Sequence, residues 1–136
     1  MASIRKADYY TMKVSQRPGA GAGLLAAMKA AGVNLLAFTG FPKAGRAQVD
    51  FIPYDASLFT RAARKLGLKV SRRKTVFLVQ GTDKAGAIAG VCGKLARAGI
   101  NMVAMDAVAA GGGRYGAIFW VKPRDVGRAS RVLRAR

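Results

Sequence analysis

The only two asparagines of the 136-residue sequence stand at equivalent points of two similar stretches. Asn34 ends the run AAGVN and Asn101 ends the run RAGIN, and an apolar segment follows each of them. A side-chain amide offers both donors and acceptors, which the ammonium and the carboxylate of an amino acid require. The pair therefore indicates a binding site for a small polar molecule. The alternative is that each asparagine only satisfies the backbone of its own bend.

The turn that opens each of these stretches offers a second group of candidate contacts. It reads QRPG from Gln16 to Gly19 and DKAG from Asp83 to Gly86. A glycine lets the backbone come close to a bound group, and the free N–H groups at a helix N-terminus suit a carboxylate. Glycine is also common in ordinary tight turns, so a purely structural role for both turns is the alternative.

The composition indicates a protein without catalytic residues. The sequence has no histidine, and its six acidic residues are all aspartates scattered along the chain. Neither a paired-carboxylate site nor a Cys–His pair can be assembled from local spacing. The single cysteine, Cys92, excludes an intrachain disulfide and a cysteine cluster for zinc, and we expect it to be a small buried hydrophobe. We therefore expect no enzyme, no metal site and no cofactor.

The chain is strongly basic, with a formal net charge of +18 at pH 7. Part of this charge lies at helical spacing, at Arg61 and Arg64 and again at Arg124, Arg128 and Arg131. Stripes of this kind could contact nucleic-acid phosphates, and binding would then fall steeply with salt. The alternative is that these arginines form the solvated outer faces of two helices.

These candidate residues require elements that position them, and the pattern between residues 8 and 72 predicts the order βαββαβ. The expected elements are strands over 9–14, 34–41, 47–52 and 68–72 and helices over 21–31 and 56–66. Asp55 is expected to cap the second helix, and Phe59 and Leu66 to belong to its buried stripe. Residues 2–7 are expected to be a frayed basic arm.

Residues 74–136 repeat this order without a final strand. The expected elements are strands over 75–80, 100–108 and 116–121, a helix over 87–98 and a last helix capped by Asp125. In a four-stranded sheet of order 4-1-3-2, the absent strand leaves one edge of the first strand unpaired, and native proteins cover such edges. Another segment or a partner chain should therefore pair there. Two of the strands are apolar on both faces, so the face without helices also needs a covering.

The repeated motifs carry a resemblance to a known family. RPG at residues 17–19, a Gly/Ala-rich helix and AGVN, repeated as KAG at 84–86 and AGIN, resemble the ACT domain. The resemblance covers residues 8–72 and 74–136 as two domains. It implies an α+β fold of two ferredoxin-like βαββαβ units in tandem, of which the second lacks its last strand.

The same resemblance implies roles for the candidate residues. ACT domains that sense serine contact it through a polar residue before the RPG turn and an asparagine after the helix. The resemblance therefore implies ligand contacts in each unit, with backbone donors from the turn glycine. The implied ligand-binding residues are Gln16, Gly19 and Asn34 in the first unit and Asp83, Gly86 and Asn101 in the second.

As a whole, the resemblance implies a non-catalytic regulatory protein that binds an amino acid at interfaces between copies of the domain. Units of about 65 residues bury little surface, so we expect them to share an interface or to form a homodimer. No apolar run is long enough to span a membrane, and the first residues lack the apolar core of a signal peptide. We therefore expect a cytoplasmic protein that does not bind membranes. A third hypothesis is a regulatory subunit that docks on an enzyme through the open sheet edge.

A basic RNA- or DNA-binding protein is the alternative function. RNA-recognition modules share the order βαββαβ, and RYGAIFW at residues 114–120 resembles the motif of their third strand. Phe77 lies near the position of their first-strand aromatic. However, the motif requires aromatics at alternate positions, and Ala117 occupies one of these positions. The ACT-like interpretation is therefore preferred.

Overall fold

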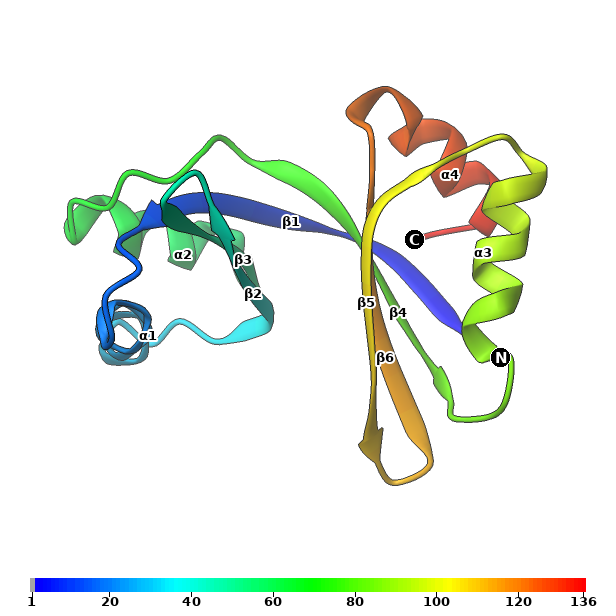
Figure 1. The fold of residues 1–136 in the computed structure, drawn as a ribbon, viewed down its shortest axis with the longest axis horizontal. Helices are drawn as coiled ribbons and strands as arrows, with labels where there is room; N and C mark the ends of the chain where they lie inside the picture. The colour runs from blue at the N-terminus through cyan, green and yellow to red at the C-terminus, as the bar shows by residue number, and fades with distance from the viewer. Residues whose placement is uncertain (1) are drawn as a thin grey trace. The chain divides into compact units, whose positions relative to one another are not determined.

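Residues 8–74 and 75–136 fold as two separate units in the computed structural model, which describes residues 2–136 (Figure 1). Residues 2–7 belong to the same unit as residues 75–136. We call residues 8–74 the N-unit, and residues 2–7 with 75–136 the C-unit. Each unit combines antiparallel strands with two α-helices. The expected α+β class with two ferredoxin-like units is thereby confirmed.

The N-unit contains a three-stranded antiparallel sheet of order β2-β3-β1. Its elements are β1 (Ser3–Val14, from Asp8 onward in this unit), α1 (Ala20–Ala30), β2 (Leu35–Lys43), β3 (Arg46–Pro53) and α2 (Ala56–Lys65). Tyr10 lies opposite Phe51, and Leu35 lies opposite Pro53. These pairings fix the two ends of the sheet. The end of β1 at Val14 lies beside the β2–β3 hairpin, and the start of β2 lies beside the end of β3.

The fourth strand that the sequence predicts over residues 68–72 does not form, and that expectation is wrong. Only Ser71 pairs with β1, because its N–H donates to the carbonyl of Thr11 at 2.8 Å. The N–H of Thr11 donates to the Ser71 hydroxyl at 2.9 Å rather than to a backbone carbonyl. This side-chain bond replaces a rung of the ladder and interrupts the strand. Leu68 and Val70 still pack against the core of the N-unit.

The core of the N-unit is built around Phe59 of α2, which has no exposed surface. Its ring lies 4.9 Å from the ring of Tyr10 and 5.1 Å from that of Phe51, between ring centroids. Aromatic pairs at this distance add stability beyond the area that they bury. The expected place of Phe59 in the buried stripe is confirmed. Leu66 is 43% exposed, because α2 ends at Lys65 and the stripe continues through Ala63 instead.

The C-unit contains β4 (Lys74–Thr82, from Thr75 onward in this unit), α3 (Ala87–Arg97), β5 (Met102–Gly111), β6 (Arg114–Val121), the 3₁₀ turn η1 (Pro123–Asp125) and α4 (Val126–Leu133). β6 lies between β4 and β5 and pairs antiparallel with both. Helices α3 and α4 cover the same face of these strands (Figure 1). Under the helices, the rings of Phe77 and Phe119 stack at 4.9 Å between centroids.

The first residues of the chain form an ordered strand rather than a frayed arm, so that expectation is wrong. β1 begins at Ser3 and is hydrogen-bonded to β4, and residues 2–7 belong to the C-unit. The N–H of Lys6 donates to the carbonyl of Arg136 at 2.9 Å, and the N–H of Arg136 donates to the carbonyl of Ile4 at 3.1 Å. The prediction that another segment pairs with the edge of the 75–80 strand is confirmed, and the segment comes from the same chain.

The face of β4 and β6 that points away from α3 and α4 is also buried. Val76 is 0% exposed, and Ile118 and Trp120 are each 8% exposed. Both faces of these strands are therefore shielded from water, as the two-sided apolar pattern predicts. Within residues 2–136, the structure contains no helix with the length and apolar character that a membrane span needs.

Asp55 caps α2 as the sequence predicts, whereas Asp125 does not cap α4. The Asp55 carboxylate accepts a hydrogen bond from the N–H of Leu58 at 3.0 Å. The Asp125 side chain makes no cap bond and lies 3.6 Å from the guanidinium of Arg128 instead. The expected cap at Asp125 is wrong because the η1 turn intervenes and places this residue in a helical conformation.

This difference predicts unequal effects of two matched substitutions. Asp55→Ala should lower the free energy of unfolding by about 1 kcal/mol, because the N–H of Leu58 loses its acceptor. Asp125→Ala should lower it by less than about 0.5 kcal/mol, because an ion pair at 3.6 Å with the half-exposed side chain of Arg128 contributes little. Denaturant unfolding followed by circular dichroism measures both values. Equal losses for the two variants would contradict the cap at Asp55.

Candidate functional site

The QRPG turn of the N-unit connects the end of β1 to the start of α1. The Gln16 side chain donates from Nε2 to the carbonyl of Arg46 at 2.6 Å, which fastens the turn to the β2–β3 hairpin. Gly19 is the N-cap residue of α1 and has a φ of 88°. This is the left-handed region, in which residues with a Cβ are strained. Glycine is therefore required by the shape of the turn itself.

The DKAG turn of the C-unit has the same construction. Gly86 is the N-cap residue of α3 with a φ of 78°. The N–H of Asp83 donates to the carbonyl of Gly113 at 2.9 Å, so this turn is fastened to the β5–β6 hairpin. The carboxylate of Asp83 is exposed. The two turns thus repeat one geometry, in which a polar residue at the strand end precedes a left-handed glycine.

The helices that follow these turns have open N-termini. Neither α1 nor α3 has a side-chain cap or an acidic residue in its first turn. The first N–H groups of a helix have no acceptor within the helix and carry a partial positive charge. α2 differs, because the Asp55 carboxylate accepts from one of its first N–H groups, that of Leu58. The starts of α1 and α3 therefore offer backbone donors to an external anion.

The two asparagines lie at the other end of these helices. The Asn34 side chain accepts a hydrogen bond from the N–H of Leu35 at 3.0 Å, and its carbonyl accepts one from Tyr54 at 3.1 Å. Asn101 is exposed between the end of α3 and the start of β5. Each helix has 11 residues, which corresponds to a length of about 16 Å. One unit therefore does not bring its turn and its asparagine to the same small ligand.

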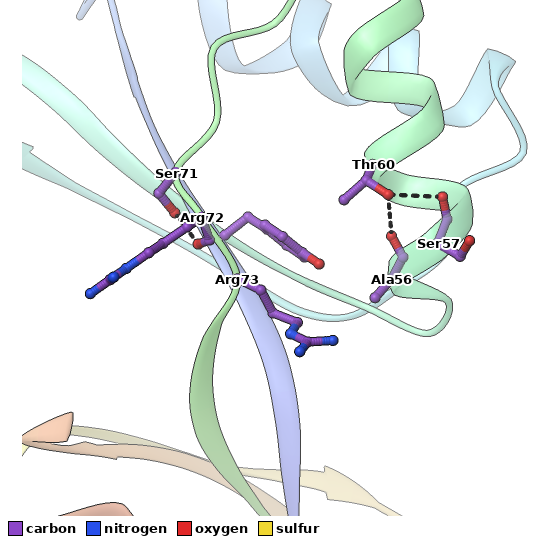
Figure 2. Close-up of a pocket in the computed structure, with 7 residues that line it drawn as sticks. Ala56, Ser57, Thr60, Ser71, Arg72 and Arg73 are labelled. Atoms are coloured by element: carbon purple, nitrogen blue, oxygen red, sulfur yellow. Dashed lines mark hydrogen bonds between the residues drawn. The ribbon is translucent and has the colours of Figure 1, made fainter. Parts of the chain in front are cut away.

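A pocket that sequence reasoning missed lies in the N-unit beside the start of α2 (Figure 2). Its volume is about 670 Å³. It is lined by Tyr10, Ala56, Ser57, Thr60, Ser71, Arg72 and Arg73. These residues come from β1, from the first turns of α2 and from the segment that precedes β4. The only signal in the sequence is the basic run after Ser71, which indicates no particular partner by itself.

Two of the pocket hydroxyls are engaged by backbone groups. Thr60 donates to the carbonyl of Ala56 or Ser57, at 3.1 and 3.0 Å. Ser71 donates to the carbonyl of Arg72 at 2.8 Å. Figure 2 shows Arg73 extending toward the side of α2, whereas Arg72 extends to the opposite side of the segment. The pocket is therefore lined by hydrogen-bond donors on one side and by the start of a helix on the other.

Burial and two nearby charged side chains change the pKa of the Tyr10 phenol. Burial raises the pKa of Tyr10 above its ordinary value of 10.0, the Asp8 carboxylate raises the pKa further, and the Arg73 guanidinium lowers it. Burial, followed by the carboxylate of Asp50, also raises the pKa of Tyr9. Both phenols therefore keep their protons to a higher pH in the folded chain than in the unfolded chain.

The raised pKa of Tyr10 predicts a pH-dependent contribution to stability. The contribution is full below pH 10, the unfolded value, and is lost as the pH rises through the folded pKa, because the folded state then holds the extra proton. Tyr10→Phe should make the alkaline fall of the free energy of unfolding less steep. Tyr54→Phe, at a ring that is 64% exposed, serves as the control. Identical alkaline profiles for wild type and Tyr10→Phe would contradict the prediction.

The basic residues predicted at helical spacing lie on exposed positions. Arg61 and Arg64 lie on α2, and Arg124, Arg128 and Arg131 lie on η1 and α4, all exposed. An RNA-recognition sheet would in addition need stacking aromatics on its helix-free face. The aromatics Phe77 and Phe119 point to the helices instead and have no exposed surface. Nucleic-acid binding through these arginines stays a prediction.

Comparison with known proteins identifies the fold. No protein-family model matches the sequence, and no curated protein does. Among solved structures, protein BT0572 from Bacteroides thetaiotaomicron is similar with a TM-score of 0.77 and 18% identity, over 98% of this chain and 88% of that one. The ligand-free regulatory subunit of aspartate kinase from Thermus thermophilus is similar with a TM-score of 0.65 and 15% identity, over 98% of this chain and 95% of that one. The regulatory subunit of aspartate kinase from Thermus flavus is similar with a TM-score of 0.58 and 15% identity, over 98% of this chain and 94% of that one.

Proposed function

The chain has the fold of a tandem ACT-domain protein, and from this we propose that it is a non-catalytic regulatory protein that binds an amino acid. Its two ACT-like domains would span residues 8–72 and 74–136. The observation that carries the proposal is the repeated turn, with a left-handed glycine before a helix that has neither a cap nor an acid. Similar solved structures named as regulatory subunits support a regulatory role.

In this proposal the amino acid's carboxylate binds at the start of α1 or α3. The first free N–H groups of the helix donate to it, and the absence of an acid in the first turn leaves the partial positive charge uncompensated. The exposed carboxylate of Asp83 is suited to the ammonium group in the C-unit, and the Gln16 amide has the corresponding place in the N-unit. Gly19 and Gly86 let the ligand approach the backbone.

The asparagines have a different role in this proposal. Because a turn and its asparagine are about 16 Å apart along a helix, both can contact one ligand only if they come from different copies of the domain. We therefore propose a homodimer in which Asn34 and Asn101 complete sites that begin at the turns of a second copy. The exposed amide of Asn101 is free to make such a contact.

Calorimetric titration with each of the twenty standard amino acids tests this function. We expect one or a few related amino acids to bind, and Asn101→Ala to weaken that binding about tenfold, which corresponds to one lost hydrogen bond of a charged ligand. Asp106→Ala serves as a control, because Asp106 is equally exposed but lies inside β5. No binding across the panel would exclude the function.

Nucleic-acid binding is the second candidate, and the exposed arginines of η1 and α4 favour it. A double variant in which Arg128 and Arg131 are replaced by glutamine should lose retention on a phosphate polymer at a lower salt concentration than wild type. Retention that the double variant leaves unchanged would exclude these residues as the contact.

A further inference from the structure

We propose that the pocket beside the start of α2 binds a phosphate group. This site is separate from the turns before α1 and α3, so it stands independently of the amino-acid function. All the residues that line it belong to the N-unit.

The first observation is a hydroxyl that has no protein partner at the wall of the pocket. Tyr10 is only 4% exposed and lines the pocket, and its hydroxyl makes no hydrogen bond to another described residue. Its ring is held in place because it is stacked on Phe59 at 4.9 Å. Water still reaches the hydroxyl oxygen, and a phosphate oxygen can replace that water as the acceptor of its hydrogen bond.

The second observation is the set of donors around this hydroxyl. Arg73 extends toward the side of α2, where the exposed Ser57 stands in the first turn of the helix (Figure 2). The N–H groups of Ala56 and Ser57 belong to the first turn, so they have no acceptor within the helix. A guanidinium, two hydroxyls and two backbone donors can all serve the oxygens of one phosphate.

The nearby carboxylates leave these donors available. Asp8 lies 3.9 Å from Arg73, but both side chains are largely solvated, at 42% and 70% exposure, so their ion pair is weak. Asp55 is engaged by the N–H of Leu58 at 3.0 Å. Neither aspartate is among the residues that line the pocket. The pocket is thus lined by two arginines and by no carboxylate that would pair with an ammonium group, which favours a phosphate over a zwitterionic amino acid.

Titration with inorganic phosphate, followed by two-dimensional NMR at constant ionic strength with chloride as the balancing anion, tests the proposal. We expect saturable shifts of the Ser57 amide and of the Arg73 Nε–H signal. Arg73→Gln should weaken binding at least tenfold, because it removes the charged donor. Tyr10→Phe keeps the ring and its stacking and should weaken binding about fivefold, as expected for one neutral hydrogen bond.

Arg64→Gln is the matched control, because it removes the same charge from an exposed residue of the N-unit that does not line the pocket. It should change the affinity less than twofold. Shifts that do not saturate, or equal weakening by Arg64→Gln and Arg73→Gln, would overturn the proposal and leave only a general attraction of phosphate to a basic chain.

A second arm of the experiment distinguishes the source of the phosphate. A short single-stranded oligonucleotide replaces inorganic phosphate in the same titration. If the oligonucleotide moves the Ser57 and Arg73 signals and Arg73→Gln abolishes this effect, the phosphate belongs to a nucleic-acid backbone. If the oligonucleotide moves only signals outside the pocket, and inorganic phosphate does not reverse those shifts, the pocket accepts the phosphate of a small molecule.

Discussion

Replacing Phe59 with alanine is expected to lower the free energy of unfolding of the N-unit by about 3–5 kcal/mol. Phe59 has no exposed surface, and its ring lies about equally close to the rings of Tyr10 and Phe51, at 4.9 and 5.1 Å. The substitution removes the ring that joins α2 to β1 and β3 and leaves a cavity that the neighbouring rings cannot fill. Denaturant unfolding followed by circular dichroism measures the loss.

Phe41→Ala is the matched control for this prediction. Phe41 is 44% exposed near the end of β2, so its truncation should lower the free energy of unfolding by less than about 1 kcal/mol. If the two variants lost the same free energy, Phe59 would not be the centre of the core that the structure describes.

Removing residues 2–7 is expected to lower the free energy of unfolding of the C-unit by at least about 3 kcal/mol and to promote aggregation. The deletion removes the hydrogen bonds between Lys6 and Arg136 and between Arg136 and Ile4, and the bond from the Arg136 guanidinium to the hydroxyl of Ser3. Each contributes about 1 kcal/mol, and the packing of Ile4 on the core is lost as well. The edge of β4 then becomes exposed, and such edges pair with other chains.

A pair of substitutions at Lys6 separates backbone pairing from the loss of charge. Lys6→Pro removes the N–H that donates to Arg136 and should cost about 2 kcal/mol. Lys6→Ala removes the same charge, keeps the N–H and should be nearly neutral, because the side chain is exposed. Similar stabilities of the two variants would show that the first residues do not pair as a strand.

Much of the fold could be predicted because local signals agree with it. α1 ends just before Gly32, which has a φ of 78°, and Asp55 caps α2; both residues act within one turn of the chain. The strand at residues 2–7 could not be predicted in this way, because SIRKA has no alternation of apolar and polar residues. Its strand conformation comes from pairing with β4, about seventy residues away in sequence. The interruption of the expected strand at Ser71 likewise could not be predicted, because it depends on a hydrogen bond between the Ser71 hydroxyl and the N–H of Thr11 on a strand that is distant in sequence.

In the candidate site, too, features set by neighbouring residues could be predicted, whereas a feature built from distant segments could not. The turns at Gly19 and Gly86 could be predicted, because a left-handed glycine before a helix leaves a signal in neighbouring residues. The separation of Asn34 from Gln16 could also be predicted, because the helix expected between them has 11 residues and so spans about 16 Å. The pocket at Tyr10 could not be predicted, since its walls come from three segments that only the folded N-unit brings together.

Amide chemical shifts during titration with amino acids test the proposed function most directly. The amino acid that binds in calorimetry should move the backbone amides of Gly21 and Ala22 at the start of α1, or of Ile88 and Ala89 at the start of α3, more than any others. It should do so in a saturable way at constant pH and salt. If a bound amino acid moved only amides elsewhere, or if none of the twenty moved these, the turns would be structural features and the proposed function would be wrong.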